Sequence, residues 1–317
     1  MDLTLIVPTH NRPDLLARLL RSLEAAKPVD MEWDLLVVDN NSAPRFVPEL
    51  ETQVAGSPLP VRLLHEPRPG KSRALNTAIR AARGEFVAFL DDDVTVHGGY
   101  LVGLEAAIRR GTNNVFGGRV LPIWPYEPPD WITGGKPLTV SRGPIVAHDY
   151  GDTPHEYDET MRRPVGCNFF CRRSLFERLG YFDERLGPGA SSGLMGGEES
   201  VLLKRFQDFG ERILYVPEVT IEHPVDPARM TRSSFRLRLF ASGRSGPYIA
   251  KESFPSVFGV PRFFFRRLAS AVAGTVWARL RGDWRSAFDH ELEICRFSGA
   301  IYESRRMQRA RRHGKGQ

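Results

Sequence analysis

The first 120 residues alternate between short apolar runs and stretches whose apolar residues recur every three or four positions. Short runs rich in valine, isoleucine and leucine are typical of buried strands, and the longer spacing is typical of amphipathic helices. Their alternation predicts an α/β fold with a mostly parallel sheet covered by helices. The predicted strands span residues 3–8, 33–39, 61–66, 85–90 and 114–120.

Two helices of this region carry clear apolar stripes. The first is predicted to begin after Asn11, a candidate N-cap, with Pro13 and Asp14 in its first turn. Its stripe consists of Leu15, Leu16, Leu19, Leu20 and Leu23. The second helix ends before Gly84. Its stripe consists of Ala74, Leu75, Ala78, Ile79 and Ala82. Both stripes are predicted to face the core.

The amino-acid composition changes after the fifth predicted strand. Residues 122–164 are rich in proline, glycine and aromatics, which predicts irregular structure beside the sheet. A short helix over 174–179, a glycine-rich loop over 187–197, a helix beginning near Glu198 and a strand ending near His223 follow. The remaining residues look helical and basic. We therefore expect a catalytic α/β domain over 1–225 and a helical appendage over 226–317.

Composition and charge narrow the class of protein. The chain has 317 residues, 41% of them hydrophobic and 26% charged, as in ordinary globular proteins. The net charge of +6 suits polyanionic partners. No signal peptide is visible, and the longest apolar run, 268–278, is too short to span a bilayer. We expect a cytoplasmic protein, with peripheral attachment to the inner face of a membrane left open. The three cysteines, without a CxxC pair, predict buried free thiols.

Polar side chains follow three of the predicted strands. Thr9 and Asn11 follow the first, Asp39 the second, and Asp91-Asp92-Asp93 the fourth. In open parallel sheets, ligands bind outside the carboxyl ends of the strands, where such residues converge. Three adjacent carboxylates repel one another unless a cation offsets them. Because Mg²⁺ and Mn²⁺ prefer oxygen ligands, a divalent metal is the expected cofactor.

Five segments together resemble family 2 glycosyltransferases of the GT-A fold. They are VPTHNR at 7–12, VVDNNS at 37–42, PGKSRALNTAI at 69–79, FLDDD at 89–93 and GGEES at 196–200. The resemblance covers roughly residues 3–225. It implies a donor site for a nucleotide-diphosphate sugar, with a saccharide or a lipid-linked molecule as the acceptor.

The resemblance implies roles for individual residues. Asp39 would recognise the nucleotide, and Asp93 would hold the Mn²⁺ or Mg²⁺ that bridges the diphosphate. His223 is a further candidate metal ligand, with a structural role as the alternative. The other candidates for nucleotide-sugar contact are Pro8, Thr9, Asn11, Lys71, Asn76, Asp91, Asp92 and Arg244. Arg236 and Arg238 are alternatives to Arg244 for contact with the departing diphosphate.

Inverting members of this family place a carboxylate base at the start of a helix, in a pair that usually reads Glu-Asp. This chain has Glu198-Glu199 instead. The resemblance implies that Glu199 is the base and Glu198 the alternative, although either could merely stabilise the helix start. The reaction would be a single displacement with inversion at the anomeric carbon. The loop 187–197 would act as a lid over the donor.

Other interpretations of the same residues remain open at this point. Asp91-Asp92-Asp93-Val94-Thr95 also fits the DxDxT motif of haloacid-dehalogenase-like phosphatases, in which Asp91 would be the nucleophile. That motif usually follows the first core strand, whereas here it follows the fourth. A non-enzymatic basic module that binds membranes or nucleic acid would explain the C-terminal arginines but not the aspartates. Nucleic acid is therefore not an expected partner.

The C-terminal region and the proline-rich segment add two open questions. Phe263, Phe264, Phe265, Leu268 and Trp277 lie among arginines, which suits peripheral membrane contact. Packing on the catalytic domain or in a homodimer explains these aromatics equally well. Trp124, Tyr126 and Trp131 could stack on an acceptor sugar or pack within their own loop.

Overall fold

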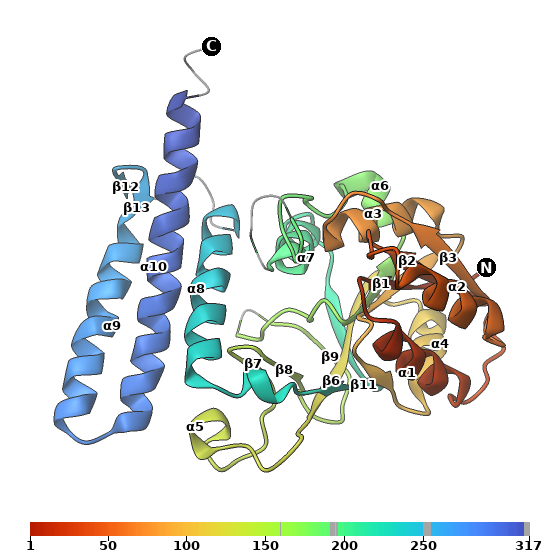
Figure 1. The fold of residues 1–317 in the computed structure, drawn as a ribbon, viewed down its shortest axis with the longest axis horizontal. Helices are drawn as coiled ribbons and strands as arrows, with labels where there is room; N and C mark the ends of the chain where they lie inside the picture. The colour runs from red at the N-terminus through yellow and green to blue at the C-terminus, as the bar shows by residue number, and fades with distance from the viewer. Residues whose placement is uncertain (159, 191–193, 195, 250–254, 314–317) are drawn as a thin grey trace.

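The computed structural model describes residues 1–158, 160–190, 194, 196–249 and 255–313 (Figure 1). Its N-terminal half consists of β1 (Leu3–Thr9), α1 (Pro13–Glu24), β2 (Trp33–Asp39), α2 (Val47–Gly56), β3 (Val61–His65), α3 (Lys71–Ala81), β4 (Phe86–Leu90), β5 (Thr95–Val96), α4 (Tyr100–Arg110) and β6 (Val115–Ile123). Then follow α5 (Asp130–Thr133), β7 (Val140–Arg142), β8 (Ile145–His148), β9 (His155–Glu156), β10 (Asn168–Arg172), α6 (Ser174–Leu179), α7 (Glu198–Asp208) and β11 (Ile213–Pro224). The C-terminal elements are η1 (Pro227–Arg229), α8 (Arg232–Ile249), β12 (Ser256–Val257), β13 (Val260–Pro261), α9 (Arg262–Leu280) and α10 (Trp284–His313).

The main sheet has the strand order β3-β2-β1-β4-β10-β6-β11-β5. Strands β1 to β4 pair in parallel, and β11 is parallel to β6. This arrangement confirms the predicted α/β class, and each predicted strand is present within one to three residues of its expected ends. The pattern did not predict β10, which runs antiparallel between β4 and β6 in the middle of the sheet.

Helices cover both faces of this sheet. On one face Leu16 and Leu19 of α1 pack with Leu104 of α4 in a fully buried cluster. On the other face Ile79 of α3 packs with Phe206 of α7. The predicted leucine and alanine stripes are therefore core, as expected, except that Leu15 is only partly buried. Burial of both sheet faces explains why β1, β2 and β4 are nearly continuous apolar runs.

The prediction that Asn11 caps α1 is wrong. Arg12 occupies the N-cap position, and no side chain caps this helix. Asn11 instead adopts a left-handed backbone conformation with φ of 58°. Its Oδ1 accepts a hydrogen bond from the backbone N–H of Ala43 at 2.7 Å, and its own N–H donates to Ser42 Oγ at 2.8 Å. Asparagine tolerates this conformation better than most residues, and here it ties the β1 loop to the β2 loop.

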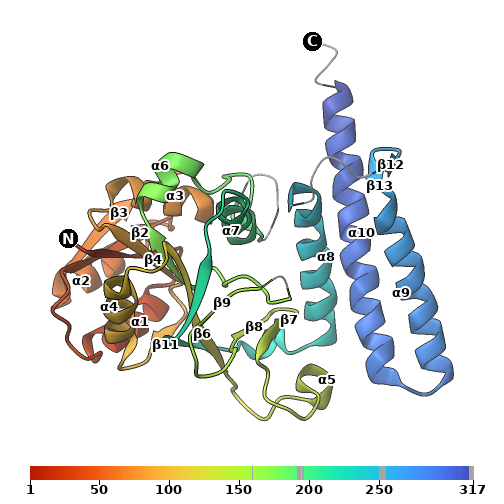
Figure 2. The same cartoon turned by 180° about the vertical axis from the view of Figure 1, so that it is seen from behind.

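The C-terminal helices form a layer beside the sheet domain, with α10 between α8 and α9 (Figures 1 and 2). The sheet ends at Pro224, close to the predicted boundary at 225. A buried cluster joins the two sides, because Ile132 and Ile145 from the irregular segment pack with Phe235 of α8 and Phe288 of α10. The division into two domains stays a prediction.

The segment predicted as irregular also contains structure: α5 and the strands β7 to β9, of which β8 and β9 pair with β6 and β11. Trp131 of α5 packs edge-on against Phe235 and Phe288, so it belongs to the joint with the helical layer. Cys167 and Cys171 are buried free thiols, and Cys295 is a partly buried one. Within the described residues, no helix has both the length and the hydropathy to cross a membrane.

Candidate active site

The carboxyl ends of β1, β2 and β4 lie at one edge of the sheet and bring the predicted polar residues together. Pro8 and Thr9 pair in register with Val38 and Asp39, so the ends of β1 and β2 are level. Strand β4 lies on the other side of β1 and ends at Leu90, directly before the three aspartates. Parallel pairing therefore gathers side chains that are up to 84 residues apart in sequence, from Thr9 to Asp93.

Asp92 is the most buried of the three aspartates. Thr9 Oγ1 donates a hydrogen bond to its Oδ2 at 2.8 Å, and Arg12 Nη1 lies 3.3 Å from its Oδ1. Burial raises the pKa of Asp92 to about 6, although Thr9 and Arg12 act in the opposite direction. Asp92 thus links β4 to the end of β1 and to Arg12. Thr9 and Asp92 act in this structure as a pair that holds the two strand ends together.

Asp91 forms a close ion pair with Lys71, the first residue of α3. Burial alone would lower the pKa of Lys71, but Asp91, followed by Glu198 and Glu199, outweighs it and raises that pKa above its ordinary value. Burial alone would raise the pKa of Asp91, yet Lys71 and, more weakly, His223 and Arg12 hold it below its ordinary value. Lys71 is therefore charged, and its charge interacts with both the aspartate run and the acidic pair on α7.

Asp93 faces one histidine and two arginines from distant parts of the chain. His223 Nε2 lies 3.8 Å from Asp93 Oδ1, while Arg12 Nη1 and Arg229 Nη2 lie 3.6 Å and 3.9 Å from Oδ2. His223 is buried, and its Nδ1 donates to the carbonyl oxygen of Pro224 at 3.1 Å. In the neutral ring this leaves the lone pair on Nε2, the nitrogen nearer Asp93.

These residues fit a divalent cation together with a diphosphate. Among the residues that the structure describes, no three His, Cys, Asp or Glu side chains form a metal-binding group. Asp93 and His223 nevertheless supply one oxygen and one nitrogen donor about 4 Å apart. Mg²⁺ and similar ions commonly use one or two carboxylates and complete their shell with phosphate oxygens and water. Arg12 and Arg229 beside Asp93 could contact the same phosphates.

Asp39 lies at the end of β2 and is buried. Its Oδ1 accepts a hydrogen bond from the N–H of Ser42 at 3.1 Å, and His65 Nδ1 lies 3.3 Å from its Oδ2. The neighbouring Asn40 accepts a hydrogen bond from the N–H of Gly70, the N-cap residue of α3, at 2.9 Å. Asp39 therefore sits in a loop cluster in which hydrogen bonds join the end of β2 to the start of α3.

Asn76 is buried on α3, and its amide contacts the backbone of Phe182 and, at 3.4 Å, the carboxylate of Glu184. Its Nδ2 donates to the carbonyl oxygen of Phe182 at 3.0 Å, and its Oδ1 accepts from the Phe182 N–H at 3.0 Å. Ser72, one turn earlier, donates to the carbonyl oxygen of Leu186 at 2.7 Å. These bonds attach the segment after α6 to α3. The expected contact of Asn76 with the donor stays a prediction.

The acidic pair begins α7, as predicted, with Gly197 as the N-cap residue. Glu198 is buried against Gly187, where a Cβ would lie 3.1 Å from its Cδ, and Oε2 has no hydrogen-bond partner among the described atoms. Glu199 lies beside Gly166. Burial, followed by the charge of Glu198, raises the pKa of Glu199 to about 7. A carboxylate with this pKa can take a proton near neutral pH.

Arg244 contacts α10 in this structure, and its expected role at the diphosphate stays a prediction. Its Nε donates to Glu303 Oε2 of α10 at 3.0 Å, and Glu303 is fully buried. Arg238, one of the predicted alternatives, lies nearer the acidic pair. Its guanidinium group is about 3.6 Å from the Cβ position of Gly196, and its charge opposes the rise in the Glu199 pKa.

Sequence reasoning assigned no role to Arg12 or Arg229. Arg12 belongs to the quoted VPTHNR segment, so its position directly after the end of β1 was a usable signal. Arg229 lies in η1 and approaches Asp93 only because β11 runs back to the same sheet edge. No local pattern marks such a residue. The predicted lid over 187–197 falls partly on residues 191–193 and 195, which lie outside the described residues.

Comparison with known proteins supports a family assignment. The family model described as "Glycosyl transferase family 2" matches residues 4–180. The succinoglycan biosynthesis protein ExoM of Rhizobium meliloti is 30% identical over 243 residues, covering 75% of this chain and 72% of that protein. A pre-mycofactocin glycosyltransferase of Mycobacterium tuberculosis is 26% identical over 251 residues, 78% of this chain. The chain spans about half the length of that relative, 47%.

Solved structures of low sequence identity share the fold. The mannosyltransferase PcManGT from Pyrobaculum calidifontis, solved with GDP-Man and Mn²⁺, superposes with a TM-score of 0.58 at 18% identity, covering 95% of this chain and 86% of that one. Residues 1–349 of S. aureus TarS, solved with UDP-GlcNAc, give a TM-score of 0.54 at 17% identity, covering 99% and 92%. These likenesses confirm the predicted GT-A type of α/β fold.

Proposed function

Because the chain belongs to glycosyl transferase family 2, we propose that it transfers a sugar from a nucleotide-diphosphate sugar to an acceptor hydroxyl. The observation that carries this proposal is the convergence of Asp39, Asp93 and His223 at one sheet edge. The charge of Lys71, which pairs with Asp91 at that edge, also acts on Glu198 and Glu199. In this proposal Asp39 serves the nucleotide, Asp93 and His223 serve the metal-bound diphosphate, and the acidic pair serves the acceptor. Synthesis of a polysaccharide or another glycoconjugate is the cellular role that suits it.

The donor would lie across the ends of β1, β2 and β4. Asp39 would accept hydrogen bonds from the nucleoside, and Asp91, oriented by Lys71, would face the ribose or sugar hydroxyls. Asp93 and His223 would hold Mn²⁺ or Mg²⁺, which, when bound, neutralises the charge that develops on the leaving diphosphate. Arg12 and Arg229 lie close enough to Asp93 to contact the same phosphates.

Glu199 would act as the general base. Its raised pKa near 7 means that the carboxylate is available at neutral pH and still holds a proton well. It would take the proton of the acceptor hydroxyl, whose oxygen attacks the anomeric carbon as the bond to the diphosphate breaks. The anomeric centre is inverted in such a single displacement. Glu198 is buried against Gly187, which suits it better for shaping the site than for meeting an acceptor.

Neither alternative interpretation accounts for this arrangement. The phosphatase motif usually follows the first core strand, whereas Asp91 follows β4, which pairs with β1. The hypothesis of a non-enzymatic basic module does not explain the acidic pair on α7 or the aspartates at the sheet edge.

The test is an assay of nucleoside diphosphate release. UDP- and GDP-sugars would be incubated with Mn²⁺ and saccharide or lipid-linked acceptors, and products would be followed by mass spectrometry. At least one pair should give acceptor-dependent release that Asp93→Asn abolishes, and NMR should find an inverted linkage. Release of phosphate from simple phosphomonoesters, without any sugar transfer, would support the phosphatase instead.

A further inference from the structure

The turn between α9 and α10 carries large apolar side chains that contact solvent. Val276, Trp277 and Leu280 at the end of α9 and Trp284 at the start of α10 are each more than half exposed. They lie within nine residues of one another, at the end of the two longest helices of the C-terminal layer. Figure 1 shows this turn projecting at the outer corner of the layer, away from the sheet. We call these four residues the hairpin tip.

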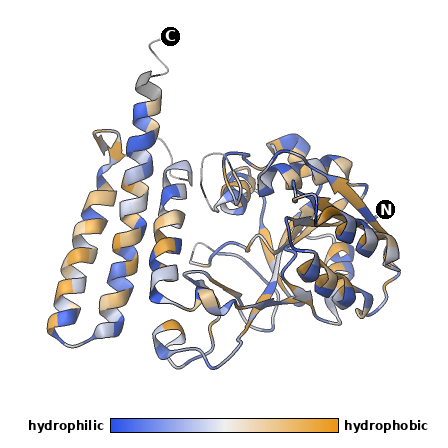
Figure 3. Cartoon of the chain, in the orientation of Figure 1, coloured by the Kyte–Doolittle hydropathy of each residue, from blue (hydrophilic) through white to orange (hydrophobic). Residues whose placement is uncertain are grey.

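The hairpin tip is not a displaced piece of the core. The inward face of α9 is supplied by Phe264, Ala271, Thr275 and Ala278, which are buried. Phe263, Phe265 and Leu268 pack partly against the cluster around Phe264. The phenylalanines considered for membrane contact from the sequence therefore face the protein, whereas Trp277 does not. Figure 3 shows that apolar positions continue along α9, the outermost helix of the layer.

Positive charge surrounds the hairpin tip. Residues 262–285 contain six arginines and one acidic residue, Asp283. The guanidinium group of Arg281 lies 5.3 Å from the centre of the Trp277 ring. Arg279 forms an ion pair with Glu291, while Arg266 and Arg281 are exposed. Tryptophan and leucine bordered by arginine are the composition of segments that lie at the boundary of a bilayer, where the rings enter the headgroup region.

We propose that the hairpin tip docks on a membrane surface that carries anionic lipids. The tryptophans and Leu280 would enter the headgroup region, and Arg281 and the exposed arginines along α9 would contact lipid phosphates. Charge complementarity favours an anionic membrane over an apolar protein surface as the partner. Lipid phosphates would pair with the arginines, whereas an apolar protein surface would leave their charges unpaired. The proposal does not depend on the identity of the transferred sugar, and it concerns a surface separate from the aspartate site.

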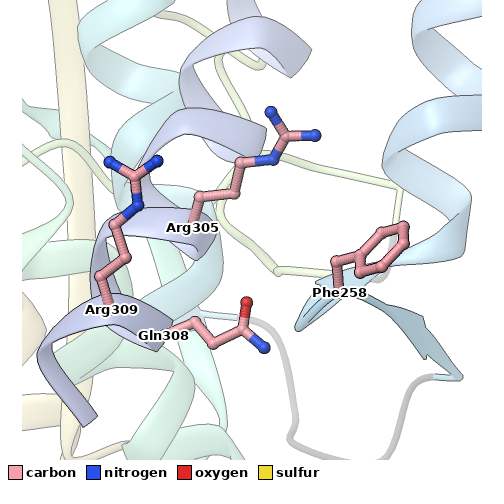
Figure 4. Close-up of a pocket in the computed structure, with 4 residues that line it drawn as sticks. All are labelled: Phe258, Arg305, Gln308 and Arg309. Carbon is pink, nitrogen blue, oxygen red and sulfur yellow. The ribbon is translucent and has the colours of Figure 1, made fainter. Parts of the chain in front are cut away.

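A second basic feature of the same hairpin provides a control. At the opposite end of α10, Phe258, Arg305, Gln308 and Arg309 line a hollow of about 240 Å³ (Figure 4). Arg305 and Arg309 carry the same charge as the arginines near the tip but lie far along the helix from Trp284. Replacing either of them by glutamine lowers the net charge by one, as Arg281→Gln does, which separates specific docking from general attraction to anionic surfaces.

The test is sedimentation of the full chain with vesicles of phosphatidylcholine, with or without phosphatidylglycerol. The parent should bind only the anionic vesicles. Trp277→Ser with Trp284→Ser should weaken binding about tenfold or more, and Arg281→Gln about fivefold. Phe209→Ser, which removes an equally exposed aromatic at the end of α7, should bind like the parent. Circular dichroism should give the same melting temperature for each variant.

Three results would overturn the proposal. The first is equal vesicle binding by the parent and the double tryptophan variant. The second is a loss with Arg305→Gln and Arg309→Gln as large as with the tip variants. The third is a parent that is a dimer in solution and becomes a monomer when the tryptophans are replaced, since the tip would then be an interface between two copies.

Discussion

Three adjacent aspartates of the same type have three different surroundings. Asp91 pairs with Lys71, Asp92 is buried between Thr9 and Arg12, and Asp93 faces His223. The chain leaves β4 at Leu90 and turns at Asp92 and Asp93, so adjacent identical side chains reach different partners. The sequence showed that the run is chemically important. It could not show which side chain contacts each aspartate, because these partners come from the loop after β1, from α3 and from the end of β11.

The pair Glu198 and Glu199 gives a prediction for pH dependence. Only the deprotonated base accepts a proton, so the rate of transfer should rise with pH and level off above about 7, the raised pKa of Glu199. Glu199→Gln should lower kcat by about 10² to 10⁴-fold and remove this acidic limb. Glu198→Gln should retain the limb but move it to lower pH, because the negative charge that raises the Glu199 pKa is gone.

The measurement is kcat at saturating donor and acceptor between pH 5 and 9, a range chosen around that pKa of about 7. A Glu199→Gln enzyme with unchanged kcat would show that the base is another group. If the rise of kcat with pH is lost in Glu198→Gln but not in Glu199→Gln, Glu198 is the general base.

At the scale of elements, the apolar pattern predicted the parallel strands β1 to β4 but not β10, at the centre of the sheet. Strand β10 is only five residues long, Asn168–Arg172, and follows a proline- and glycine-rich segment. Its antiparallel pairing with β4 and β6 depends on contacts between Phe169, Phe170 and residues more than 50 positions earlier. No local periodicity encodes such a pairing. A strand, the helix after it and the next parallel strand, in contrast, produce a recognisable pattern of apolar positions along the chain.

Helix α3 has a supporting role that a substitution can isolate. In Asn76→Ala, the N–H and carbonyl group of Phe182 lose their partner in a buried environment. The free energy of unfolding should fall by about 1 to 3 kcal/mol. KM for the donor should change less than threefold, because the amide contacts backbone and is buried.

Chemical denaturation and donor saturation curves measure the two quantities separately. A large rise in donor KM with unchanged stability would restore the predicted contact between Asn76 and the donor.

At the scale of the whole molecule, the helical layer is tied to the sheet domain through a buried aromatic cluster and within itself through charged groups. Phe235, Phe288 and Trp131 form the aromatic joint. Arg244, Arg306 and Tyr248 surround the buried Glu303. The basic, helical character of this region was predictable from composition. Which side of α9 faces the protein was not predictable, because arginines and large apolar residues are interspersed along its sequence.

The ion pair between Arg244 and Glu303 predicts a structural effect of substitution. Arg244→Met removes one cation beside a fully buried carboxylate and should lower the free energy of unfolding by about 3 kcal/mol. Donor KM should stay within about twofold, since this side chain faces α10. The thermal unfolding midpoint and donor saturation kinetics test the two statements.

Glu303→Gln serves as the matched variant on the other side of the pair. It should be less destabilising than Arg244→Met, because it removes the buried negative charge, whereas Arg244→Met keeps that charge buried with one cation fewer beside it. A rise in donor KM of tenfold or more in Arg244→Met, at unchanged stability, would return Arg244 to the diphosphate site.

The central claim is that the sheet edge binds a nucleoside diphosphate together with a divalent cation. Isothermal titration calorimetry of UDP and GDP, with and without Mn²⁺, measures this directly. One of them should bind at least about tenfold more tightly with Mn²⁺, and Asp93→Asn should remove that gain, while Asp152→Asn, at an exposed position, should keep it. If neither nucleotide binds in a metal-dependent way, or Asp93→Asn binds as tightly as the parent, the account is wrong.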